Sequence, residues 1–134
     1  MSSLQNSLSL LGRVLLAGLF IPAGFAKITG FSGAVAYIAS KGVPFPELAG
    51  AAAVGVELVL GLLLLIGWQA RWAALGIAFF TVVVTFVFHN FWAIPADQVM
   101  QQQSFFKNIA VVGGLLTVAA WGAGAWSFDG NRSG

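Results

Sequence analysis

Hydrophobic residues are concentrated in four long runs, at about residues 8–26, 48–68, 72–92 and 105–125. Each run has the roughly 20 apolar residues that an α-helix needs to cross a bilayer. The second and third runs are joined by residues 69–71 alone, which predicts an antiparallel helical hairpin. The pattern predicts an all-α fold, an integral membrane four-helix bundle that forms a single domain over residues 1–134.

The segment between the first and second runs carries a weaker helical pattern. Phe31, Val35 and Ile38 are spaced as one face of a helix, so we expect a short interfacial helix there. Pro44 and Pro46 should end it and lead into the second span. The segment between the third and fourth runs is polar and rich in glutamine, and we expect it to be exposed.

Composition supports the membrane assignment and excludes several kinds of chemistry. Only 7% of residues are charged, whereas soluble domains have about 25%. The net charge is only +2, and the lysines and arginines form no basic stripe, which argues against a nucleic-acid partner. With no cysteine, the chain has no disulfide, thiolate metal site or CxxC redox motif. His89 is the only histidine, so a bis-histidine haem is excluded too, and we expect no metal and no covalently bound cofactor.

Glu57 is the only ionisable residue in the second run. A carboxylate near the middle of a bilayer costs roughly 2.5–3.5 kcal/mol on insertion scales. Such a residue normally faces the protein interior and has a partner, so Glu57 marks a candidate functional site. It shares a helical stripe with Ala53 and Gly61, small residues that let a neighbouring helix approach closely.

Other unusual polar residues lie in the same half of the predicted membrane, on the side opposite the termini. Glu57 is about nine residues, or roughly 13 Å, into its run from that side. The remaining candidates are near the ends of the first, third and fourth runs on that side. We therefore expect a polar pocket formed by Lys27, Glu57, His89, Asn90, Lys107 and Asn108.

Two lysines compete as the partner of Glu57. Either Lys27 or Lys107 can reach inward on its flexible stem, while His89 can hydrogen-bond the carboxylate or shuttle a proton. Asn90 and Asn108 would add amide donors and acceptors. The alternatives are that the lysines and His89 extend to the interface, as residues near span ends usually do, and that Glu57 forms a purely structural ion pair.

Lysine and arginine positions predict the orientation. The side of the termini holds Arg13, Arg71 and Arg132, and the opposite side holds three lysines. If Lys27 and Lys107 point into the bundle, the count becomes three against one. On that basis we expect both termini in the cytoplasm.

Motifs along nearly the whole chain resemble the DoxX family of small four-helix bacterial membrane proteins. Ala123 departs from the pattern, because relatives often have proline in a Gly-Pro-Gly turn there. The motifs are residues 12–17 (GRVLLA), 24–31 (GFAKITGF), 36–44 (AYIASKGVP), Glu57, 61–67 (GLLLLIG), Arg71, 88–92 (FHNFW), 106–108 (FKN) and 122–129 (GAGAWSFD).

The resemblance implies a location in the bacterial inner membrane and a link to redox chemistry. Some members look like membrane subunits of quinone-linked oxidoreductases, and many have no assigned reaction. The polar positions shared with the family match Lys27, Glu57, His89, Lys107 and Asn108.

Three functions fit these observations. The first is a quinone-interacting membrane subunit, which would need a membrane or soluble oxidoreductase partner because the chain has no redox residue pair of its own. The second is a carrier or permeation module for a small solute, which would require a homo-oligomer. The third is a scaffold subunit of a membrane complex, in which Glu57 and a lysine hold the helices together.

Overall fold

The computed structural model describes residues 2–132, and all regular structure in that range is helical. The first span is α1 (Ser3–Thr29), followed by the short α2 (Phe31–Ser40). The second span is one continuous rod made of α3 (Pro46–Gly55), a π-helical turn (Val56–Leu60) and α4 (Gly61–Ile66). The third and fourth spans are α5 (Ala70–Phe88) and α6 (Gln98–Trp121). Four segments are thus long and apolar enough to cross a membrane, as predicted.

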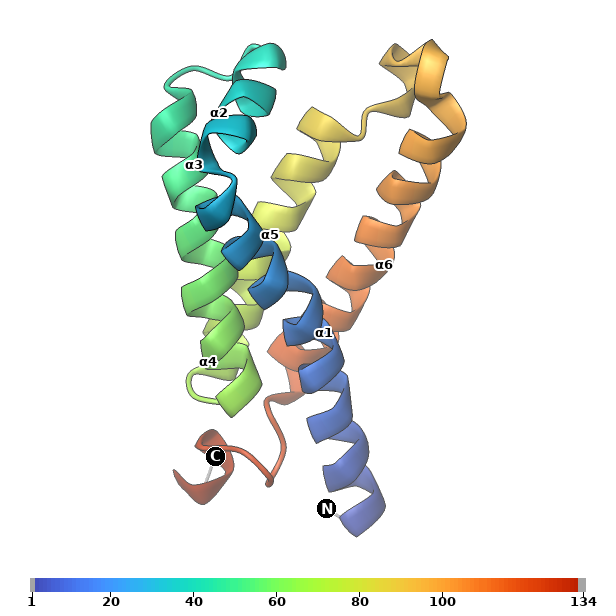
Figure 1. Ribbon diagram of the computed structural model, residues 1–134. Coiled ribbons are helices and arrows are strands. Elements are labelled where there is room, and N and C mark those ends of the chain that lie inside the picture. Colours follow the sequence, from blue (N-terminus) through green and yellow to red (C-terminus); the bar gives the residue numbers. More distant parts are fainter. Residues whose placement is uncertain (1, 133–134) are drawn as a thin grey trace.

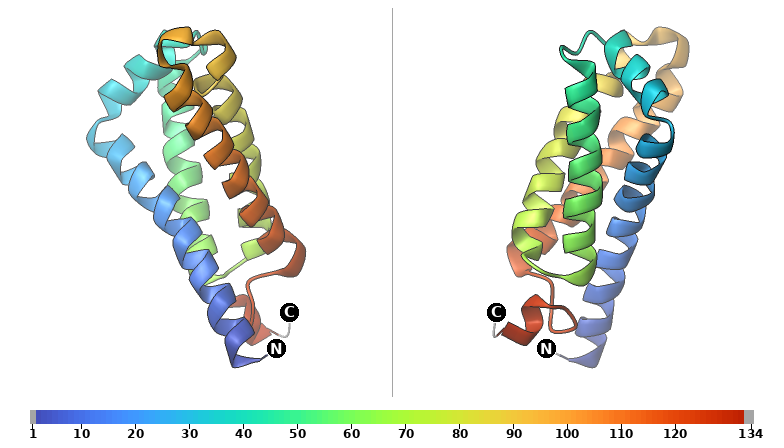
Figure 2. Two further views of the ribbon diagram at one scale, coloured as in Figure 1. Left: turned by 90° about the vertical axis from the view of Figure 1, so that its right-hand side faces the viewer. Right: turned by 60° about the vertical axis from the view of Figure 1, so that its left-hand side comes forward.

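The four spans run up and down, so that both termini lie at the same end of the molecule (Figure 1). In Figure 1, α1 and α6 are close together near the termini, and α6 leans away from α1 toward the opposite end. The two views of Figure 2 show the same elongated bundle, with α2 crossing its far end. Apart from α2, that far end carries the connection between α5 and α6.

Local sequence signals explain most helix ends. Ser2 and Gln5 form a capping box at the start of α1, each side chain bonding the other's backbone N–H. Pro46 occupies the first position of α3, where its missing N–H is not needed. Gly67 ends α4 at φ 76°, in the left-handed region that favours glycine.

The predicted interfacial helix is present as α2. Ile38 is buried, and the Phe31 ring lies so close to Gly50 of α3 that a Cβ there would be 3.1 Å from it. The predicted apolar face therefore packs against α3. Tyr37 stacks on Phe88 at the end of α5, with ring centroids 5.3 Å apart.

The boundaries of the last two spans differ from the sequence-based prediction. α5 ends at Phe88, and two 3₁₀ turns follow, Phe91–Ala93 and Pro95–Asp97. α6 begins at Gln98, so part of the segment expected to be an exposed loop belongs to the helix. Glutamine is a good helix former despite its polarity, and hydropathy alone therefore placed the start of this helix too late.

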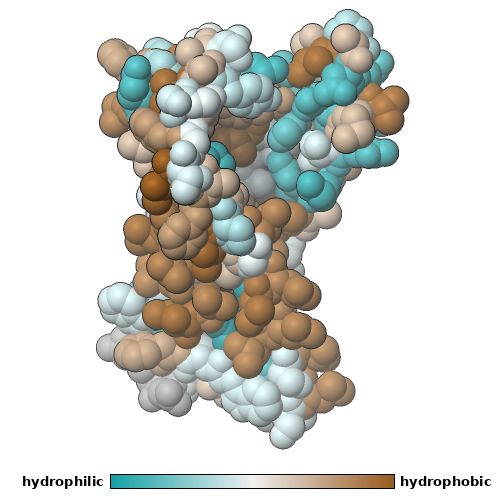
Figure 3. Space-filling model, viewed as in Figure 1, coloured by the Kyte–Doolittle hydropathy of each residue, from teal (hydrophilic) through white to brown (hydrophobic). Residues whose placement is uncertain are grey.

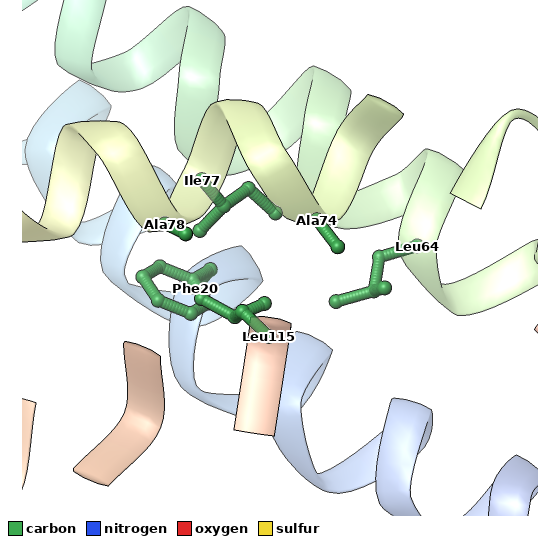
Figure 4. Packing of buried hydrophobic residues seen from close by; sticks show 6 residues of the cluster. All are labelled: Phe20, Leu64, Ala74, Ile77, Ala78 and Leu115. Carbon is green, nitrogen blue, oxygen red and sulfur yellow. The ribbon is translucent and has the colours of Figure 1, made fainter. Parts of the chain in front are cut away.

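The hydrophobic core joins all four spans near the middle of the bundle. Phe20 of α1, Leu64 of α4 and Leu115 of α6 meet three residues of α5 (Figure 4). Leu115 is the only buried residue of α6. Large apolar side chains elsewhere point outward and form a hydrophobic band around the middle of the molecule, with polar residues at both ends (Figure 3). This is the surface expected of a protein surrounded by lipid.

Candidate functional site

Glu57 is buried and forms an ion pair with Lys27. Lys27 Nζ lies 2.8 Å from Glu57 Oε1, an atom that has almost no contact with solvent. The Glu57 side chain is 6% exposed, whereas that of Lys27 is 32% exposed. The structure therefore selects Lys27, of the two lysines considered, as the partner of the carboxylate.

Glycines bring α1 and the second span close enough for this pair to form. A Cβ at Gly24 would lie 2.7 Å from Leu58 Cγ and 3.3 Å from Glu57 Cβ. A Cβ at Gly61 would lie 3.0 Å from Ile21 on α1. Gly24 and Lys27 are three residues apart on one face of α1, so the close approach at Gly24 also directs Lys27 toward Glu57.

Glu57 lies inside the π-helical turn Val56–Leu60. A π turn interrupts the regular α-helical hydrogen bonding, and such turns occur frequently at functional sites. The predicted stripe of Ala53, Glu57 and Gly61 faces inward, since all three residues are buried. The irregular turn was not predicted, because no residue type in this apolar run marks it.

The other candidate residues are not joined to this pair. Within residues 2–132 no hydrogen bond or ion pair connects His89, Asn90, Lys107 or Asn108 to Lys27 or Glu57. Lys107 is exposed, and Asn108 is half-buried. The expectation that Lys107 points into the bundle is therefore wrong, because its part of α6 leans away from the other spans (Figure 1).

His89 bonds to the start of α6 instead. Its Nδ1 lies 2.7 Å from Gln101 Oε1. Asn90 Oδ1 is shielded from solvent and has no hydrogen-bond partner among the described residues. The buried hydroxyls of Thr81 and Thr85, which precede His89 on the same face, donate to the carbonyls of Ile77 and Thr81.

A cluster of aromatic rings surrounds the connection between α5 and α6. Phe91 and Phe105 pack edge to face with centroids 5.5 Å apart, and Phe105 also contacts Phe86 at 5.2 Å. Trp92 and Phe106 belong to the same cluster. The described residues contain no group of three or more His, Cys, Asp or Glu side chains placed to hold a metal ion.

Arg13, which the sequence presents as an orientation signal and as part of a family motif, forms a second buried polar centre. The residue is 1% exposed. Its guanidinium donates to four backbone carbonyls, at distances of 2.6–3.0 Å: Leu64, Leu65, Ala123 and Trp126. Arg13 thus holds the polypeptide after α6 against the end of α4.

Asp129 completes this attachment of the tail. Its carboxylate accepts hydrogen bonds from the backbone N–H groups of Gln69 and Ala70, both at 2.9 Å. These donors lie at the start of α5, where a helix has unpaired N–H groups and a partial positive charge. The available sequence signal was a charged residue inside the first apolar run, together with a glycine-rich tail that contains Asp129.

Comparison with known proteins places the chain among inner membrane proteins. The DoxX family model matches residues 8–90, and the SURF4 family model matches residues 51–133. Inner membrane protein YphA of Escherichia coli is 36% identical over 123 residues, which are 91% of this chain and 88% of that protein. Inner membrane protein YqjF of the same organism is 37% identical over 129 residues, 96% of this chain and 95% of that protein.

A more distant relative is the Surfeit locus protein 4 homolog of Schizosaccharomyces pombe, 29% identical over 70 residues, which are 50% of this chain and 23% of that protein. No solved structure matches the chain. The DoxX match covers more than half of the chain, and the two bacterial relatives are covered almost completely. The chain therefore belongs to the DoxX family and is a multi-pass protein of the inner membrane.

Proposed function

We propose that this protein is a quinone-interacting, redox-associated subunit of the inner membrane and that the Lys27–Glu57 pair is the centre of its binding site. The observation that carries the proposal is the unequal burial of the pair. Glu57 is 6% exposed and Lys27 is 32% exposed. The pair therefore keeps one face accessible within the membrane-spanning region.

The chemistry of the pair suits a quinone headgroup. An ammonium group has three N–H donors, and Glu57 is the only partner of Lys27 among the ion pairs of residues 2–132. A quinone carbonyl accepts hydrogen bonds and carries no charge, so it can bind Lys27 without displacing Glu57. The carboxylate of Glu57 holds the ammonium group of Lys27 in place.

The surroundings of the pair favour an amphipathic ligand, with a polar headgroup and an apolar chain. Lys27 is in the last turn of α1, toward the end of the bundle away from the termini. Toward that end the surface is hollowed between the upper part of α6 and the other spans (Figure 3). Aromatic rings and lipid-facing hydrophobic residues are abundant at this end. A quinone ring with an isoprenoid chain would reach such a site from the bilayer.

The chain cannot pass electrons through thiols, because it has no cysteine. Electrons would therefore pass directly between the quinone and an oxidoreductase partner, which is either membrane-bound or soluble. This holds for a single copy of the chain and for a homo-oligomer. To identify such a partner, the wild-type protein is purified from its native membrane and the redox proteins that copurify with it are identified by mass spectrometry.

Quinone binding tests the proposal directly. Purified protein in lipid nanodiscs is titrated with a short-chain benzoquinone, and the dissociation constant is compared for wild type, Lys27→Met and Glu57→Gln. We expect Lys27→Met to weaken binding at least tenfold, since the proposed donor is lost. Lys107→Met is the matched control, because Lys107 is exposed on α6, and its affinity should equal that of wild type.

Other outcomes favour the two alternative functions. If Glu57→Gln lowers thermal stability while the dissociation constant stays unchanged, the pair is a structural lock and the quinone proposal is wrong. If purified wild-type protein moves a small anion across liposomes and Lys27→Met does not, the pair belongs to a permeation pathway.

We also propose that both termini are in the cytoplasm. Arg13 and Lys27 are both bonded inside the bundle, so Arg71 and Arg132 on the side of the termini stand against Lys41 and Lys107 on the other side. The charge count is then equal, and a labelling experiment decides the orientation. Because the chain has no cysteine, one cysteine placed at Ser3 or at Ser40 reports its side unambiguously. A membrane-impermeant maleimide added to intact spheroplasts should label only the Ser40→Cys variant, and labelling of Ser3→Cys instead would reverse the orientation.

A further inference from the structure

His89 is held by a chain of two side chains at the start of α6. His89 follows the last residue of α5, and its Nδ1 lies 2.7 Å from Gln101 Oε1. Gln101 Nε2 in turn donates to Asp97 Oδ2 at 3.0 Å. Asp97 and Gln101 are four residues apart, on one face of the first turn of α6. The three side chains thus link the end of α5 to the start of α6.

The direction of these hydrogen bonds fixes the position of the imidazole proton. The carboxylate of Asp97 only accepts, so the NH₂ group of Gln101 must face it. The amide oxygen of Gln101 is then the atom that faces His89, and this oxygen also only accepts. His89 Nδ1 must therefore carry the hydrogen, and in the neutral imidazole Nε2 keeps an unprotonated lone pair.

We propose that Gln101 and Asp97 are positioning residues that hold His89 as the Nδ1–H tautomer, so that Nε2 is an acceptor site for the hydroxyl group of a quinol. The identity of this ligand rests on the proposed function, whereas the tautomer does not. A quinol hydroxyl donates a hydrogen bond and a quinone carbonyl cannot. A fixed acceptor at Nε2 therefore favours the reduced form of the ligand.

The neighbourhood of His89 suits a flat ring. Phe91 is two residues away and packs edge to face with Phe105, at a centroid distance of 5.5 Å. Tyr37 stacks on Phe88, the residue before His89. Aromatic rings pack well against one another in stacked and edge-to-face arrangements, so a ligand ring bound at His89 would have aromatic neighbours at this end of α5.

The tautomer is directly measurable because His89 is the only histidine of the chain. Protein labelled with ¹⁵N-histidine in lipid nanodiscs gives one pair of imidazole signals, recorded at a pH where the ring is neutral. We expect a protonated Nδ1 and an unprotonated Nε2 in wild type. Gln101→Ala should shift the population toward the Nε2–H form, and Gln103→Ala, an exposed glutamine on the same helix, should leave the signals unchanged.

The Asp97→Asn variant tests whether Asp97 fixes the orientation of the Gln101 amide, because Gln101 itself can still contact His89. An asparagine at this position can donate or accept, so Gln101 is no longer forced to turn its oxygen toward His89. We expect a mixture of tautomers with the helix intact. A wild-type spectrum dominated by Nε2–H, or an unchanged tautomer in Gln101→Ala, would overturn the inference.

Quinol binding tests the acceptor site. Adding a short-chain benzoquinol under anaerobic conditions should shift the Nε2 signal of wild type, and the oxidised benzoquinone should shift it much less. His89→Ala should weaken quinol binding about tenfold and leave quinone binding within twofold. If quinol binds but the Nε2 signal of His89 does not shift, the acceptor site is overturned, whereas the tautomer and the proposed function stand. If neither form binds to a protein with the Nδ1–H tautomer, the proposed function fails and the acceptor site fails with it, but the positioning role of Gln101 and Asp97 stands.

Discussion

The bundle contains two buried charges, Arg13 beside the end of α4 and Glu57 near the middle of the second span, and their surroundings are opposite in kind. Arg13 is 1% exposed, and four of its five N–H groups are bonded to backbone carbonyls. Glu57 is buried against Lys27, whose side chain remains 32% exposed. One site is closed and saturated with protein partners. The other has an ammonium group with donors to spare.

The difference indicates which charge serves the fold and which can serve a ligand. A fully bonded guanidinium has little capacity left for another molecule, and its partners come from residues far apart in the sequence, 64 and 65 against 123 and 126. Arg13 therefore connects helix ends. The lysine has one carboxylate partner and an accessible face. A buried charge can bind a ligand, then, only if some of its hydrogen-bonding capacity is left open.

Removing Arg13 should have the largest effect. Arg13→Ala leaves four carbonyls without their donor, and hydrogen bonds to charged groups contribute about 1.5–3 kcal/mol each. Allowing for carbonyls that find water near the membrane surface, we expect a loss of about 3–5 kcal/mol in unfolding free energy, measured by denaturant titration in mixed micelles. Arg71→Ala is the matched control, since Arg71 is exposed. Equal losses in both variants would remove the structural role of Arg13.

The closed site should also reject a methyl group at Gly67. A Cβ there would clash with Ser127 and lie 2.8 Å from an Arg13 nitrogen, on a backbone with φ 76°. Gly42 has nearly the same φ, 77°, with no atom within 4 Å of its would-be Cβ. Gly42→Ala should therefore show only the left-handed backbone cost of roughly 1–2 kcal/mol. Gly67→Ala should lower the unfolding free energy by at least about 1 kcal/mol more, and equal losses would mean that the tail is not held tightly.

The open site should show a smaller coupling. In a double-mutant cycle of Lys27→Met and Glu57→Gln, the interaction free energy of residues in contact is about 0.5–3 kcal/mol. We expect about 1–2 kcal/mol, because Lys27 is partly accessible to polar surroundings that substitute for Glu57. The measurement is again unfolding in mixed micelles. A coupling as large as the Arg13 effect would make the pair a structural lock and weaken the distinction between the two sites.

Asp129 should contribute least. Asp129→Ala removes the acceptor for two N–H groups at the start of α5, and loss of a helix cap costs about 1 kcal/mol. Glu47→Ala removes another carboxylate from the start of a helix, α3, where no side-chain cap is formed. The Asp129 variant should lose more unfolding free energy than the Glu47 variant, and the reverse order would show that the tail contact does not cap α5.

Sequence alone determined the number of spans, the interfacial helix and the need of Glu57 for a partner. These features follow from hydropathy and helical spacing, which act over a few turns and are independent of the partner helices. An isolated carboxylate in an apolar run requires a partner wherever it is placed. For the same reason the four-helix fold and the membrane location could be predicted before the structure was known.

Tertiary structure decided which partner each charge has. Lys27 and Lys107 both suited Glu57 by depth, and the lean of α6 away from α1 left Lys107 exposed while the contact at Gly24 brought Lys27 to the carboxylate. By sequence Arg13 resembles an ordinary interfacial charge, but in the structure the tail lies over it and accepts its hydrogen bonds through the carbonyls of Ala123 and Trp126. Depth along a helix is a local property, but rotation, tilt and the path of the tail depend on packing between distant segments, and these determined the two polar sites.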